Sequence, residues 1–510
     1  EGPTETEMLD WMRLWEFEGG GSDEASEALE FLLEHGFEDK DRAYAFIHGF
    51  REGRCYRGLT GEAQARVDRL MPNALREVAF TSDPETTLRR FIGLLERIAA
   101  RSAYVALLSE NPDALNQLVK LIAQSEWAAS WIRNYPAILD SLLVPLEETD
   151  LQDQEYLAAR FARAIELLEN DDLEPALDAL REVHHSRTLR IAAGFLSGEL
   201  DASTAGYALS LLADAALSVA LTMAQMQLRD DLGSVVAPGE GLPLAVLAYG
   251  KLASRELGYG ADLDIVMIYD DTRVLANSEG GEKAVPVEMY FARLCQKLVF
   301  LLTTTTSAGK LYEIDMRLRP SGQSGLLVTS VKSFRKYQLE RAQLWEHHAF
   351  TRTRIAVGDS VLGQKIRDIR QRALMHPRTL QEVMGHMVNM RKRMRKEHDK
   401  SSDDFFDLKQ GVGGLVDIEF LAQAIVLVFA KDYPELLEEH TTPGLLVAAA
   451  ACGVFDPTVA QSLGDIYCEY LSFDHGYKLA NKPVHVPSDQ VQNSRNAVES
   501  AWNSFLKFED

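Results

Sequence analysis

Two aspartates, Asp262 and Asp264, stand one residue apart where the apolar run LDIVMIYD begins. Side chains alternate faces along a β-strand, so the two carboxylates would point the same way. Neighbouring carboxylates repel each other, and each raises the pKa of the other. A divalent cation removes that cost, and Mg²⁺ takes one or two protein carboxylates and completes its shell with substrate phosphates. The pair therefore predicts a metal site for phosphate chemistry.

A later segment, KLYEIDMRLRP, repeats the alternation. If it is a strand that ends at Pro320, then Glu313, Asp315, Arg317 and Arg319 share its polar face. Asp315 would supply a third carboxylate if this strand lies beside the first. Arginine binds phosphate through paired, charge-assisted hydrogen bonds, so the two arginines suit a nucleotide.

A glycine turn precedes the aspartate pair. Gly250 follows the apolar run LAVLAY and comes before a short expected helix. Backbone N–H groups at such a turn suit a phosphate. Lys251 and Ser254 would add a charge and a hydroxyl. The glycine spacing fits neither a P-loop nor a dinucleotide-binding fingerprint.

Together these features favour two-metal phosphoryl or nucleotidyl transfer, in which two cations stabilise the attacking and leaving oxygens. Simpler interpretations exist for each part alone. An isolated D-x-D is more often a solvated turn, and Arg317 and Arg319 could pair only with Glu313 and Asp315. The glycine turn and the second charged strand together weigh against the solvated turn.

The elements that must position these residues form a small α/β unit between helical regions. Helical periodicity predicts a helical region over 1–200 and another over 359–510. The core, 201–358, would begin with a long buried helix over 203–231. It would continue with strands in LAVLAY, LDIVMIYD, KLYEIDMRLRP and SGLLVTS, and with a helix that starts near Pro286. The expected fold is mainly α with a small α/β core.

Composition excludes several classes of protein. The 510 residues carry a net charge of −24, which disfavours a nucleic-acid partner because Lys and Arg drive phosphate-backbone binding. The four cysteines form no C-x-x-C pair, and no uninterrupted apolar run reaches the length of a membrane span. The start, EGPTETEM, lacks a signal pattern. A cytoplasmic protein with no membrane partner is expected, and this chain could be part of a longer one.

The glycine turn, the D-x-D and the later aspartate resemble the DNA polymerase β-like nucleotidyltransferase superfamily. Four blocks are similar, in order, to glutamine synthetase adenylyltransferase: GKLASRELGYGADLDIVMIYD, YEIDMRLRPSGQSGLLVTS, WEHHAFTRTRIAVGD and DLKQGVGGLVDIEFLAQ. The forms GYGADLD and GGLVDIEF look like the C-terminal, adenylylating half of that enzyme. Two departures are Ala261, where the family has Ser, and Ala253–Ser254, where it often has two glycines. They leave the nucleotide contacts less defined.

The resemblance implies a polymerase β-like sheet, ATP as substrate and two Mg²⁺ ions. Asp262, Asp264 and Asp315 would bind the metals, with Asp315 near the attacking hydroxyl. Gly250, Lys251 and Ser254 would lie by the triphosphate, and Arg317 and Arg319 by the nucleotide or pyrophosphate. The protein substrate would be a tyrosine of glutamine synthetase. Regulation by the PII signal protein and by glutamine is also implied, with the C-terminal helices as a candidate place.

Two other hypotheses remain open. The chain could be the deadenylylating half, which uses phosphate to remove AMP from glutamine synthetase and yields ADP. It could instead be a regulatory scaffold with an inert nucleotidyltransferase core, which the acidic charge and abundant helix would suit. The presence of all three carboxylates favours an active enzyme.

Overall fold

The computed structural model describes residues 5–16, 22–143, 154–169 and 172–506. The chain divides into two compact units, which are described separately. Unit 1 comprises Glu1–Leu146, His185–Glu199 and Lys478–Lys482, and unit 2 comprises Glu147–His184, Leu200–Tyr477 and Pro483–Asp510. The structure is mainly helical with one small mixed sheet, which confirms the predicted fold class. The predicted domain boundaries at 200 and 358 stay a prediction.

Unit 1 is helical wherever the structure describes it. Its helices enclose one apolar cluster that includes Trp11, Leu70, Phe91 and Leu118. Helix α6 shows how the sequence fixes these elements: Asp83 accepts a hydrogen bond from the Thr86 amide, and a proline follows the cap. The elements are α1 (Glu5–Glu16), α2 (Ser22–Glu34), α3 (Lys40–Glu52), α4 (Arg54–Arg57), α5 (Gly61–Ala79), α6 (Pro84–Ile98), α7 (Ser102–Glu110), α8 (Pro112–Gln124), α9 (Glu126–Asn134) and η1 (Pro136–Leu143). Helix α12 (Leu173–Ser197) contributes residues to both units.

The sheet of unit 2 has the order β3–β2–β1–β5, with β4 also paired to β2. Its strands are β1 (Leu244–Tyr249), β2 (Leu263–Tyr269), β3 (Ile314–Asp315), β4 (Val328–Ser330) and β5 (Thr353–Gly358). Strand β1 is antiparallel to β2 and β5, whereas β3 and β4 are parallel to β2. Strand β1 is buried along its whole length, as expected of an apolar central strand.

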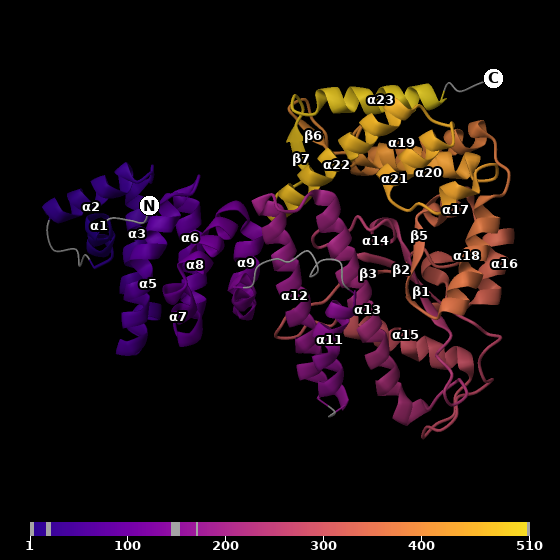
Figure 1. The fold of residues 1–510 in the computed structure, drawn as a ribbon, viewed down its shortest axis with the longest axis horizontal. Helices are drawn as coiled ribbons and strands as arrows, with labels where there is room; N and C mark the ends of the chain where they lie inside the picture. The colour runs from indigo at the N-terminus through magenta and orange to yellow at the C-terminus, as the bar shows by residue number, and fades with distance from the viewer. Residues whose placement is uncertain (1–4, 17–21, 144–153, 170–171, 507–510) are drawn as a thin grey trace. The chain divides into compact units, whose positions relative to one another are not determined.

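Helices cover this sheet. Helix α13 (Ala202–Leu232) packs on α15 (Val287–Thr303) and on β5, whereas α16 (Val331–Glu340) and α18 (Ser360–Leu374) pack on each other and on strands. Figure 1 shows the strands between α13 at the left and α16 and α18 at the right. By length and composition, α13 could cross a membrane, but 83% of its most apolar window is buried inside the protein. It is therefore placed as a core helix, as the sequence predicts.

The remaining elements of unit 2 are mostly C-terminal helices. They are α11 (Gln154–Glu169), α14 (Gly250–Ala253), η2 (Gly322–Ser324), α17 (Leu344–Thr351), α19 (Leu380–His398), β6 (Phe405–Asp407), α20 (Leu415–Phe429), η3 (Pro434–Leu437), α21 (Thr442–Ala451), α22 (Pro457–Leu479), β7 (His485–Pro487) and α23 (Gln492–Leu506). Strands β6 and β7 form an antiparallel pair. Helix α20 packs against α17, which directly precedes β5. This contact joins the C-terminal helices to the sheet.

The structure corrects one predicted strand and adds three. Only Ile314–Asp315 of KLYEIDMRLRP is a strand, because the chain turns immediately after Asp315. Alternation therefore does not extend to Arg317 and Arg319, and the expected shared polar face is absent. Strands β5, β6 and β7 were not expected from the sequence.

Candidate functional site

The three predicted carboxylates converge at the start of β2. Asp264 lies opposite Asp315 in the parallel register of β2 and β3. The Leu263 amide donates to the Glu313 carbonyl over 2.9 Å, which fixes that register. Asp262 precedes the strand by one residue and is exposed. The structure thus brings Asp315 beside the pair, as the sequence argument required.

The electrostatics of Asp264 reflect this crowding. Burial, followed by repulsion from Asp315 and Asp262, raises its pKa to about 6. Asp315 behaves in the opposite way, because hydrogen bonds from Arg317 hold its pKa below the usual value. The guanidinium Nε of Arg317 lies 2.7 Å from Asp315 Oδ2, and the Arg317 amide lies 2.8 Å from Oδ1. Arg317 therefore places a positive charge in direct contact with this cluster.

Arg317 and Arg319 differ in their contacts. The Arg317 side chain is 71% exposed and can reach a ligand at the carboxylates. Arg319 donates to the carbonyls of Met316 and Gly325, so it helps to hold the turn that follows β3. These contacts favour a ligand-facing role for Arg317 and a structural role for Arg319.

Gly250 lies directly against the cluster. It follows β1 with a φ of +56°, a conformation that favours glycine. A Cβ atom at this position would meet Asp264 Oδ2 at 3.0 Å. The next residue, Lys251, forms an ion pair with Asp474 at 3.6 Å. The glycine turn and the carboxylates therefore share one site.

Substitution of Gly250 by Ala is expected to lower catalytic activity by about 10- to 100-fold while the protein remains folded. The added methyl group would displace the Asp264 carboxylate, and small displacements of reacting groups have effects of this size. Gly239 provides a matched control, since its φ is +87° but a Cβ atom added there would meet no atom within 4 Å. Gly239→Ala should show similar backbone strain and normal activity. Equal activity loss in both variants would contradict the proposed contact.

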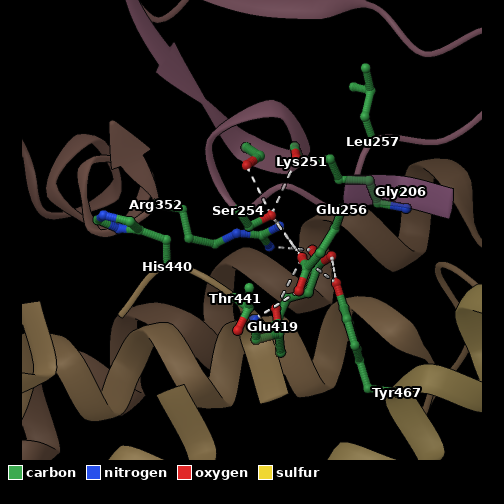
Figure 2. Close-up of polar contacts among 12 residues, drawn as sticks. Gly206, Lys251, Ser254, Glu256, Leu257, Arg352, Glu419, His440, Thr441 and Tyr467 are labelled. Atoms are coloured by element: carbon green, nitrogen blue, oxygen red, sulfur yellow. Dashed lines mark hydrogen bonds and ion pairs between the residues drawn. The ribbon is translucent and has the colours of Figure 1, made fainter. Parts of the chain in front are cut away.

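The Ser254 hydroxyl bonds within the protein. It is fully buried, and its hydroxyl donates to Glu256 over 2.7 Å. Arg352 donates to the same hydroxyl over 2.8 Å and to Glu256 over 3.0 Å. Figure 2 shows these side chains converging with Glu419 and Tyr467. The contacts of Ser254 favour a role in positioning the turn rather than direct contact with a phosphate.

The buried network continues into the C-terminal helices. Arg352 pairs with Glu419 on α20 at 3.2 Å, and the hydroxyl of Tyr467 on α22 lies 2.9 Å from Glu256 and 3.0 Å from Glu419. The amide of Thr442, at the start of α21, donates to Glu256 over 2.8 Å. Helices α21 and α22 therefore contact the segment that follows the glycine turn, and α20 is joined to it through Arg352 and Tyr467.

Lys409 is a further site residue that the sequence argument missed. It lies in the loop before α20. Burial, Asp315 and Asp262 raise the pKa of Asp264, and the positive charge of Lys409 offsets a part of that rise. Burial opposes ionisation of Glu419, but Arg352, Lys251, Tyr467 and Lys409 together hold its pKa below the usual value. Asp407 fixes the loop by accepting from the amides of Lys409 and Gln410. The block DLKQGVGGLVDIEFLAQ contains a sequence signal for Glu419, because Asp417 and Glu419 are acidic residues inside an otherwise apolar helix.

The three carboxylates have the donor atoms that a cation prefers, but they do not form a preformed metal-binding site. Among the described residues, no group of three or more His, Cys, Asp or Glu side chains has donor atoms placed to hold a metal ion. Asp315 accepts hydrogen bonds from Arg317 instead. The donor chemistry still fits Mg²⁺, because carboxylate oxygens are its preferred protein ligands. A cation would also relieve the repulsion that raises the pKa of Asp264.

Comparison with known families identifies two matching regions. The model for glutamate-ammonia ligase adenylyltransferase matches residues 115–369. The model for GlnD PII-uridylyltransferase matches residues 382–480. The first match includes the carboxylates, the glycine turn and all five strands of the main sheet. The second includes the loop with Lys409 and the helices that carry Glu419 and Tyr467.

Similar full-length proteins are named bifunctional glutamine synthetase adenylyltransferase/adenylyl-removing enzyme. The relative from Thioalkalivibrio sulfidiphilus is 36% identical over 96% of this chain and 50% of its own length. The relative from Nitrosococcus oceani is 38% identical over 96% of this chain and 51% of its own length. The chain therefore spans about half the length of these relatives.

Proposed function

Because the chain belongs to the glutamate-ammonia ligase adenylyltransferase family, we propose that it transfers AMP from ATP to a tyrosine hydroxyl of glutamine synthetase and releases pyrophosphate. The main support is the convergence of Asp262, Asp264 and Asp315 beside the Gly250 turn. Three carboxylates beside a glycine turn and cationic side chains suit nucleotidyl transfer.

Asp262, Asp264 and Asp315 would hold two Mg²⁺ ions. When bound, such ions neutralise phosphate charge and make the phosphorus more susceptible to attack. Arg317 competes with a cation for the Asp315 carboxylate, because its guanidinium and amide already donate to both carboxylate oxygens. A cation at Asp315 would leave Arg317 available to the nucleotide phosphates.

The remaining contacts to ATP would come from Gly250, Lys251 and Lys409. The Gly250 turn brings the backbone close to the carboxylates, and the two lysines supply charge near Glu419 and Asp264. Arg319 and Ser254, whose side chains bond within the protein, would position this surface rather than touch the phosphates. This assignment revises two of the roles that the sequence resemblance implied.

The tyrosine oxygen would attack the α-phosphorus and pyrophosphate would leave. A free tyrosine has a pKa of about 10, so its proton must be accepted as the bond forms. Asp315 is the proposed acceptor, once Arg317 no longer holds its carboxylate. The bond between the α-phosphorus and the pyrophosphate oxygen would break, the tyrosine oxygen would carry the adenylyl group, and its proton would pass to Asp315 and then to solvent.

A second candidate is removal of AMP by phosphorolysis. The relatives are named for both activities, and this chain covers only about half of each, so the AMP-removing activity stays a candidate. In that reaction inorganic phosphate, rather than tyrosine, would attack and ADP would form. The match to GlnD PII-uridylyltransferase over 382–480 supports a further proposal: the PII protein and glutamine act on these helices.

The deciding experiment incubates the chain and Mg²⁺ with α-labelled ATP and unmodified glutamine synthetase. We expect label on a tyrosine of glutamine synthetase, with one pyrophosphate released for each AMP transferred. A parallel reaction contains AMP-modified glutamine synthetase and phosphate. Phosphate-dependent ADP formation without labelling in the first reaction would establish the second candidate and reject the first.

A further inference from the structure

One buried carboxylate of helix α22 faces the glycine turn. Oδ2 of Asp474 lies 3.6 Å from Nζ of Lys251, the residue that follows Gly250. The Asp474 side chain is 7% exposed, whereas that of Lys251 is 21% exposed. Carboxylates that are this deeply buried are normally paired with a cation. The ion pair therefore joins α22 to the turn that lies against Asp264.

Other residues of α22 hold Asp474 in place. Tyr467 precedes it by seven positions, about two turns of the helix, so the two side chains lie on the same face. The Tyr467 hydroxyl lies 2.9 Å from Glu256, a contact that Figure 2 shows. The ring of His475, the residue after Asp474, packs edge to face on Tyr259 with the ring centroids 5.2 Å apart. Because Tyr467 and His475 are both buried, α22 is fixed against the segment that follows the glycine turn.

Lys251 keeps hydrogen-bond donors for a ligand while it is paired with Asp474. An ammonium group has three N–H donors, and only one of them needs to face the carboxylate. The four-carbon stem of a lysine is flexible, so an unheld ammonium must be ordered whenever it binds a phosphate. Glu419 also lies close enough for Lys251 to act on its pKa, and it offers the ammonium a second position. Asp474 therefore determines where the charge of Lys251 lies before a nucleotide binds.

We propose that Asp474 is a positioning residue that holds the Lys251 ammonium where the triphosphate of ATP binds, so that α22 forms part of the ATP site. This inference rests on the proposed function, which assigns Lys251 to ATP. A carboxylate repels phosphate, so Asp474 acts through Lys251 and does not touch the nucleotide. Loss of its negative charge should therefore weaken ATP binding, although a simple charge argument predicts stronger binding.

The test measures the Kd of a non-hydrolysable ATP analogue with Mg²⁺ by calorimetry, without glutamine synthetase. We expect Asp474→Asn to raise this Kd about five- to tenfold, because the Lys251 side chain must then be ordered on binding. Asp465→Asn is the matched control, since Asp465 is exposed on the same helix, and its Kd should be unchanged. An unchanged or lower Kd for Asp474→Asn would overturn the proposal. If the native chain binds the analogue but labels no tyrosine of glutamine synthetase, the proposed transfer fails and this inference stands.

Lys251→Met tests whether Asp474 acts through Lys251. This change should raise the Kd at least about tenfold, because a charge-assisted hydrogen bond is lost. Adding Asp474→Asn to Lys251→Met should raise the Kd no further, since residues that act through one another do not contribute additively. Asp474→Glu moves the carboxylate by one methylene group and serves in the same cycle if Asp474→Asn does not fold; it should raise the Kd about two- to fivefold, and only when Lys251 is present. A rise that persists in Lys251→Met would show that Asp474 supports the fold alone, and would overturn the proposal.

Discussion

Replacement of Asp264 by Asn should abolish AMP transfer and leave the protein at least as stable as before. Asn keeps the size of the side chain but removes a charge that would help Asp262 and Asp315 to hold a cation. Loss of one such electrostatic contact to the transition state lowers rates by at least about 10²- to 10³-fold. Both other carboxylates are close enough to act on Asp264, so the loss should be at the upper end of that range.

The stability prediction follows from the raised pKa of Asp264. The ordinary pKa of an aspartate is 3.8, and that of Asp264 is about 6 in the folded protein. Between pH 3.8 and about pH 6, the Asp264 carboxyl therefore keeps its proton in the folded state and has lost it in the unfolded state. The stability that this proton contributes is present below pH 3.8 and is lost as pH rises through 6. At pH 7.5 the ionised carboxylate costs at most about 3 kcal/mol, and Asn removes that cost.

The measurement combines AMP-transfer rates with urea unfolding at pH 5 and pH 7.5, the latter without divalent cations. The gain in unfolding free energy of Asp264→Asn should be larger at pH 7.5. Asp271→Asn is the control, because Asp271 follows the other end of β2 and is no part of the carboxylate cluster. Normal transfer by Asp264→Asn, or loss of its folded structure, would refute the assignment.

The strands nearest the proposed catalytic residues could be predicted because their sequence signals are local. LAVLAY and LDIVMIYD are short apolar runs, and they form β1 and β2. The pairing of Asp315 with Asp264 was predicted only conditionally, since alternation places residues on a face but does not choose neighbouring strands. The strand end after Asp315 was missed because its carboxylate bonds the Arg317 amide two residues later and so stabilises a turn.

Other features depend on residues distant in sequence. Strand β5 carries Arg354 with much of its surface buried, and that is tolerated because Asp214 on α13 pairs with it at 2.8 Å. The resemblance placed Ser254 by the triphosphate, and the sequence alone does not show that its hydroxyl bonds Glu256 and Arg352. No spacing rule connects Glu256 with Glu419 and Tyr467. These partners are set by how α20 and α22 pack, which the sequence pattern does not specify.

Replacement of Arg352 by Met should lower the unfolding free energy by about 3–5 kcal/mol, since it leaves buried carboxylates without their cation. Arg352 is 3% exposed and bonds both Glu256 and Glu419. The Tyr467 hydroxyl lies close to both carboxylates, but it carries one proton and can donate to one of them only. Arg352 is therefore the group that allows the two acids to stay together.

The unfolding free energies of the native protein and of Arg352→Met should change with pH in opposite directions. In the native protein the pKa of Glu419 is held below its usual value. The ionised carboxylate therefore stabilises the fold at pH values above the pKa of the unfolded state, and this stability is lost as pH falls through the pKa of the folded state. In Arg352→Met the same carboxyl is buried without its cation, which raises its folded pKa. The stability of the variant should then fall as pH rises. The difference between the two proteins should be largest near pH 8 and should narrow toward pH 5.

Urea unfolding of Arg352→Met, alone and with Glu256→Gln, measures this effect. The second change removes one of the two buried charges, so it should restore about 1–3 kcal/mol. Arg341→Met, at an exposed position, should change stability by less than about 0.5 kcal/mol. Because Ser254 and Glu256 directly follow the Gly250 turn, Arg352→Met should also lower the AMP-transfer rate, and the added Glu256→Gln should restore part of it. If stability returns without activity, Arg352 holds the C-terminal helices but does not position the Gly250 turn.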